Sequence, residues 1–167
     1  MKKILKNHGF INIRTASLFA IVLIMSSCSK WIVPAEYVGK WESNRQEITV
    51  RTKASHEPFV FTSGYAEVSV TINADKTASG RIGSAHFSNA IVKKNRGLPW
   101  DKNVSPAYII RCGSIGKIFA TDPLNQKEVE IWFAPINNNG ISNSELRYTQ
   151  NGAQFPMADI MFMKVKK

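Results

Sequence analysis

The sequence predicts an all-β fold, a single antiparallel meander β-barrel of about eight strands, on three observations. Short segments alternate apolar and polar residues with a period of two. Turn residues separate these segments along most of the 167-residue chain, and no long segment shows the periodicity of a helix. A β-sandwich has the same pattern and stays open as an alternative architecture.

The predicted strands follow one another from residue 39 onward. The most regular pair, residues 67–72 and 77–82, flanks the turn sequence Asn73-Ala74-Asp75-Lys76 and predicts a hairpin. One helical turn with proline at its start is predicted at residues 34–38. The other predicted strands are 47–53, 59–61, 87–93, 108–112, 117–120, 128–133, 145–148 and 160–165. Alternation points the following apolar residues inward: Val68, Val70, Ile72, Ile82, Ile118, Ala120, Ile131 and Phe133.

Residues 1–27 have the organisation of a secretory signal. Four basic residues without an acid precede an apolar run over 18–25, and two serines then precede Cys28. This run is about half the length of roughly 20 residues that a membrane-spanning helix needs. We therefore expect residues 1–27 to be removed, with an ordinary signal peptide or a short tether as the alternatives to a lipoprotein signal.

The segment Ser26-Ser27-Cys28 resembles the lipobox of bacterial lipoproteins, with Met25 where that motif usually has leucine. The resemblance implies that Cys28 receives lipid and becomes the N-terminus, that 28–36 is a lipidated tether and that 37–167 is the barrel domain. By resemblance to other Gram-negative lipoproteins, Ser29 implies the outer membrane, and the absence of an acidic cluster after it favours the leaflet that faces the periplasm. The expected partner is therefore the membrane, through lipid on Cys28.

The chain is basic, with a formal net charge of +10, and it stays basic without residues 1–27. A positive excess favours anionic partners such as lipid headgroups, lipopolysaccharide phosphates or acidic glycans, and scattered surface lysines are the alternative explanation. Export argues against nucleic acid. If Cys28 carries lipid, Cys112 has no partner for a disulfide, and its apolar surroundings predict a small buried residue.

Gly39-Lys40-Trp41, placed before the first long strand, resembles the opening motif of the lipocalins and of small lipocalin-like lipoproteins of Bacteroidetes-type bacteria. In that family the tryptophan closes one barrel end, and an arginine from a late strand lies across the indole. The resemblance implies this structural role for Gly39, Trp41 and Arg147. A second family motif has a partial counterpart in Thr121-Asp122-Pro123, which is equally typical of an ordinary turn.

Two functions follow from such a barrel, depending on whether the interior is hollow or filled. In the first, Val70, Ile131 and Phe133 line a cavity for a small apolar or amphipathic ligand. In the second, a filled barrel contacts an envelope protein, glycan or lipid through the basic loop 93–103. The residues of that loop expected to bind an anionic or sugar-bearing ligand are Lys93, Lys94, Arg96 and Trp100.

Catalysis is not expected, because no nucleophile, phosphate or metal motif is present. His56 and His86 lie far apart in the sequence, and His86 has no acid nearby. Glu128 and Glu130 share one face of a predicted strand, which is typical of a solvated outer surface. We therefore predict a protein that is not an enzyme and that holds no metal or cofactor.

Overall fold

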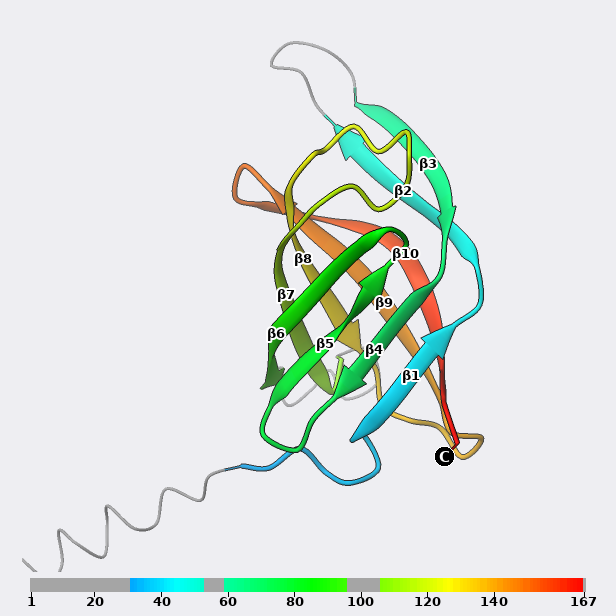
Figure 1. Ribbon diagram of the computed structural model, residues 1–167, viewed down its shortest axis with the longest axis vertical. Coiled ribbons are helices and arrows are strands. Elements are labelled where there is room, and N and C mark those ends of the chain that lie inside the picture. The colour runs from blue at the N-terminus through cyan, green and yellow to red at the C-terminus, as the bar shows by residue number, and fades with distance from the viewer. Residues whose placement is uncertain (1–30, 53–58, 96–105, 167) are drawn as a thin grey trace, which may run out of the picture. The chain divides into compact units, whose positions relative to one another are not determined.

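Eight antiparallel strands form a closed barrel in the computed structural model, which describes residues 31–52, 59–95 and 106–166. The order around the barrel is β1-β10-β9-β8-β7-β6-β5-β4, so the strands from β4 to β10 form a meander and β1 closes it (Figure 1). The predicted all-β barrel is confirmed. Its strands are β1 (Gly39–Ser43), β4 (Val68–Ile72), β5 (Thr77–Ile82), β6 (Ala85–Lys94), β7 (Tyr108–Ile115), β8 (Lys127–Phe133), β9 (Ile141–Gln150) and β10 (Ala153–Lys164).

A two-stranded ribbon, β2 (Gln46–Thr52) and β3 (Val60–Ala66), leaves the barrel between β1 and β4. Ile48 and Val50 of β2 are fully buried, and β2 packs against β10. Fully burying an aliphatic side chain contributes about 1.5–3 kcal/mol, so these two residues fix the inner face of the ribbon on the barrel. The opposite face of the ribbon points to solvent.

The two ends of the barrel are built from different turns. The end where β1 begins, called the entry end below, carries the turn 34–37, the β4–β5 turn 73–76 and the β8–β9 loop 134–140. The other end, called the ribbon end, carries the ribbon, the β5–β6 turn at 83–84 and the β7–β8 loop 116–126. Chain register supports this assignment, since Gly39 pairs with Ile72 at the entry end.

Two local predictions are wrong. Residues 117–120 are not a strand but part of the loop 116–126, where Asp122 accepts a hydrogen bond from the Ile118 N–H at 2.8 Å. Ala120 in this loop is exposed, not inward-facing. Residues 34–38 form a hydrogen-bonded turn, Tyr37 N–H to the Pro34 carbonyl at 2.9 Å, without becoming a helix. In both places local side-chain and turn bonds replace the predicted regular element.

Candidate functional site

An aromatic cluster fills the barrel at the entry end. The Trp41 indole is fully buried, and its Nε1–H donates to the Tyr37 carbonyl at 2.9 Å. The Trp41 ring lies edge-on to Phe133 at 5.1 Å, and Phe133 stacks on Phe162 at 5.4 Å. The Tyr37 ring lies edge-on to Tyr108 at 4.7 Å. Trp41 therefore closes this end by packing and by one buried hydrogen bond.

The backbone conformation at Gly39 favours glycine. The prediction that Arg147 lies across the Trp41 indole is wrong. Gly39 has φ of 127°, a left-handed conformation that favours glycine. The cation beside Trp41 is Lys164, whose Nζ is 5.5 Å from the indole centroid. Arg147 instead lies 3.8 Å above Trp132 on the outer face of the barrel. The alternation in Leu146-Arg147-Tyr148 already places Arg147 opposite to its buried neighbours.

The three residues expected to line a ligand cavity are core residues. Val70, Ile131 and Phe133 are each 0% exposed, and Phe133 contacts three aromatic rings. Three surface hollows lie among the described residues. One lies on the outer face of β4–β6, one beside Arg45 and Phe119, and one at the entry end. Val70, Ile131 and Phe133 line none of these hollows. Ligand binding inside the barrel stays a prediction, and the packing around Phe133 does not favour it.

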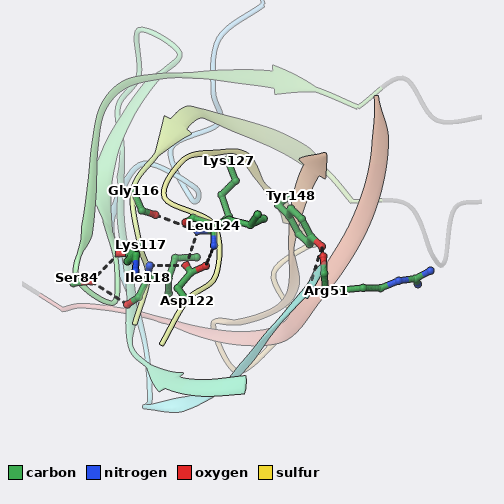
Figure 2. Close-up of polar contacts among 9 residues, drawn as sticks. All are labelled: Arg51, Ser84, Gly116, Lys117, Ile118, Asp122, Leu124, Lys127 and Tyr148. Atoms are coloured by element: carbon green, nitrogen blue, oxygen red, sulfur yellow. Dashed lines mark hydrogen bonds and ion pairs between the residues drawn. The ribbon is translucent and has the colours of Figure 1, made fainter. Parts of the chain in front are cut away.

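A buried ion pair organises the ribbon end. Lys127 Nζ lies 2.5 Å from Asp122 Oδ2, with the two side chains 1% and 0% exposed (Figure 2). The ammonium also donates to the carbonyls of Gly116 and Leu124, each at 3.2 Å. Asp122 in turn accepts from the N–H groups of Ile118 and Leu124, at 2.8 and 3.0 Å. Each charge is thus surrounded by hydrogen-bond partners, as a buried ion requires.

The loop held by this ion pair is attached to both of its neighbours. Ser84 Oγ donates to the Lys117 carbonyl at 2.7 Å, and the Ser84 N–H donates to the Ile118 carbonyl at 3.0 Å. Phe119 packs on Gly64 of the ribbon, where an added Cβ would lie 2.4 Å from the ring. Only glycine leaves room for Phe119 there. The loop 116–126 therefore joins the barrel turn to the ribbon.

Tyr148 attaches the ribbon from inside the barrel. Its hydroxyl accepts from the Arg51 N–H at 3.1 Å and donates to the Arg51 carbonyl (Figure 2). Burial raises the pKa of Tyr148, and the hydrogen bond from the Arg51 N–H opposes that rise. One side chain of β9 thus satisfies both backbone groups of a residue 97 positions away in the sequence.

We expect alkaline pH to destabilise the fold, in part through Tyr148. Burial raises the pKa values of Tyr37, Tyr108 and Tyr148, so the folded state holds these protons more tightly than the unfolded state. The contribution of these tyrosines to the free energy of unfolding is complete below pH about 10, and it is lost as the pH rises through their raised pKa values. Tyr148→Phe should lower the free energy of unfolding by about 1–3 kcal/mol at neutral pH. The same change should reduce the loss of unfolding free energy as the pH rises above about 10, measured by urea unfolding at a series of pH values. An unchanged dependence of the unfolding free energy on pH would contradict the role of Tyr148.

The outer face of the ribbon is aromatic and cationic. Phe61 is 64% and Tyr65 is 62% exposed, on the solvent side of β3. The Arg51 guanidinium lies 3.2 Å above the Phe59 ring and 5.9 Å from Phe61, and Arg45 lies 5.9 Å from Tyr65. Sequence reasoning missed this surface. Its signal was the spacing of Phe59, Phe61 and Tyr65, which places three aromatic side chains on the same face of one strand.

The predicted basic loop is only partly described. Lys93 and Lys94 end β6 at the entry end and are exposed. Arg96 and Trp100, like the lipidation residue Cys28 and the histidine at 56, lie outside the described residues. The structure therefore places two of the four predicted contact residues and leaves the grouping of the loop a prediction.

The remaining candidate chemical groups are dispersed. Cys112 is buried, and burial raises the pKa of its thiol, so it is unsuited to act as a nucleophile. Glu130 pairs with Arg111 at 3.0 Å on the outer face of the sheet. Residues 31–52, 59–95 and 106–166 contain no group of three or more His, Cys, Asp or Glu side chains suited to a metal ion.

In the same ranges, no helix has the length and apolar character needed to cross a membrane. Comparisons of the chain with family models, curated proteins and solved structures found no match.

Proposed function

We propose that this protein is a non-catalytic interaction module of the bacterial envelope, anchored by lipid on Cys28, whose filled barrel presents the β2–β3 ribbon to a protein partner. The observation that carries the proposal is the ribbon itself. Within residues 31–52, 59–95 and 106–166, strand β3 has a hydrogen-bonded neighbour on one side only, and its exposed residues include Val60, Phe61 and Tyr65. A packed interior beside an unprotected apolar edge favours surface recognition over carriage of a ligand.

The free edge of β3 supports a protein strand as the partner. An edge strand offers unpaired N–H and C=O groups, which natural proteins usually protect with lysine, proline or a covering segment. The described part of β3, residues 60–66, contains neither lysine nor proline. An extended segment of another chain can pair with this edge, while its side chains contact the exposed rings.

The arginines of the ribbon indicate carboxylates on that segment. Arg51 is held against the rings of Phe59 and Phe155, at 3.2 and 5.0 Å, which fixes where its charge is presented. Arg45 lies beside Tyr65 at the other end of the ribbon. Guanidinium groups bind carboxylates in a planar, two-bonded geometry, so an extended strand with acidic residues fits this face.

The proposal is tested by photo-crosslinking in the native bacterium. A photoreactive residue replaces Tyr65 on the ribbon, and in a matched variant it replaces Asn143, an exposed residue of β9. We expect a discrete protein adduct at position 65 that is absent at 143 and is lost when Phe61 is changed to serine. The proposal would be overturned by the absence of an adduct at position 65 or by equal adducts at both positions. It would also be overturned by an adduct that glycan hydrolases remove and protease does not.

The anchor is tested separately. The mass of the N-terminal peptide should show acyl groups on Cys28, and Cys28→Ala should release the protein from membranes. An N-terminal peptide without acyl groups would remove the anchor from the proposal while leaving the ribbon interaction to the crosslinking result.

A further inference from the structure

Most lysines among the described residues lie at the entry end of the barrel. They are Lys40, Lys76, Lys93, Lys94, Lys164 and Lys166. The acidic residues described at this end are Glu36, Glu42 and Asp75, and Glu42 pairs with Lys40 at 2.6 Å. At the ribbon end, Lys127 is neutralised by Asp122, which leaves Lys117 as the exposed lysine of the loop 116–126. Lysine charge is therefore concentrated where β1 begins.

Apolar side chains are exposed among these lysines. Ile32 is 70% and Val165 is 40% exposed. A hollow of about 1040 Å³ lies beside Val165, lined by Val38, Gly39, Asn139 and Gly140 together with Lys40, Lys164 and Lys166. Exposed apolar groups ringed by lysine are typical of a surface that rests on a lipid headgroup region, where the aliphatic stems and the ammonium groups both find partners.

We infer that the entry end docks on an anionic lipid surface, with its lysines at the lipid phosphates and with Ile32 and Val165 among the headgroups. This inference rests on the proposed lipid on Cys28. At most about 14 Å of extended chain joins Cys28 to Ile32, so an anchored Cys28 keeps this end of the barrel at the bilayer. The attraction between the lysines and anionic lipids then selects the orientation.

The same orientation serves the proposed ribbon interaction. The ribbon leaves the barrel at the end opposite to the lysines. With the entry end on the lipid surface, β3 is turned toward the aqueous compartment, where a partner strand can reach it.

The test measures which end of the lipidated, full-length protein touches the membrane. Single cysteines at Val165→Cys and Asn125→Cys, the second in the ribbon-end loop, carry a fluorophore, while buried Cys112 stays unlabelled. The protein is reconstituted in phosphatidylglycerol–phosphatidylcholine vesicles and in pure phosphatidylcholine, each with headgroup-quencher lipid. We expect stronger quenching at 165 than at 125 in both kinds of vesicle, because the short link to Cys28 acts in both, and a several-fold larger difference in the anionic vesicles.

Charge variants separate docking from simple tethering. Lys93→Glu, Lys94→Glu and Lys166→Glu together should reduce the difference between positions 165 and 125 to its value in pure phosphatidylcholine, as should 1 M salt, where the Debye length is about 3 Å. Lys117→Glu, the matched change at the ribbon end, should leave it unchanged. A difference between positions 165 and 125 that is the same in anionic and neutral vesicles, on protein with acylated Cys28, overturns the inference alone. An unmodified Cys28 in the mass spectrum overturns the anchor and the inference with it.

Discussion

Replacing Lys127 with methionine is expected to lower the free energy of unfolding by about 3–5 kcal/mol. The change leaves the Asp122 carboxylate without its cation at a position where that side chain is 0% exposed. It also removes the donors to the carbonyls of Gly116 and Leu124. Urea unfolding followed by tryptophan fluorescence at neutral pH measures the loss.

Two further variants define what this result means. Lys127→Met combined with Asp122→Asn should recover part of the loss, because the amide is neutral and its oxygen still accepts one backbone N–H. Lys117→Met, an exposed change in the same loop, should stay within about 0.5 kcal/mol of the unaltered protein. A loss below about 1 kcal/mol for Lys127→Met would show that the pair behaves like a solvated surface salt bridge.

Replacing Trp41 with alanine is expected to cost about 3–5 kcal/mol of unfolding free energy. The indole is fully buried, contacts Phe133 and donates to the Tyr37 carbonyl, so its removal leaves a cavity and an unpaired acceptor. Thermal and urea unfolding measure the change. Trp41→Phe, which keeps a ring but loses the donor, should cost less and keeps the comparison possible if the alanine variant fails to fold.

Arg147→Ala is the control for the packing at this end. Arg147 lies over Trp132 on the outer face, so we expect a loss of about 0.5–1 kcal/mol, as for an exposed cation–π pair. A loss equal to that of Trp41→Ala would show that Arg147, not Lys164, supports the buried tryptophan.

Alternation of side chains was sufficient to predict an all-β fold, but it did not distinguish a barrel from a sandwich. In β4 and β8 every second residue is buried, as the period of two requires. The same pattern was misleading at residues 117–120, where Ile118 and Phe119 are buried although they belong to a loop and not to a strand. Burial of a loop depends on contacts with Ser84 and Gly64, which are distant in sequence and leave no periodic signal.

The ion pair and the ribbon were not predicted from the sequence, although the sequence does contain a signal for the ion pair. Lys127 falls in the inward register of β8 with Val129 and Ile131, and a lysine in that register indicates a buried ion pair. The ribbon gave no comparable signal. The sequence around Tyr65 has the alternation of a barrel strand. Only the pairing of β1 directly with β4 shows that β3 is not part of the barrel wall.

The position of β1 between β4 and β10 has a consequence for how the chain matures. The first barrel strand pairs with the last, Trp41 opposite Lys164, so the barrel wall is incomplete until β10 has been synthesised. Contacts between such distant parts of a chain form slowly, because a long loop must close first. A nascent polypeptide therefore cannot close this barrel before β10 has been synthesised and has reached β1.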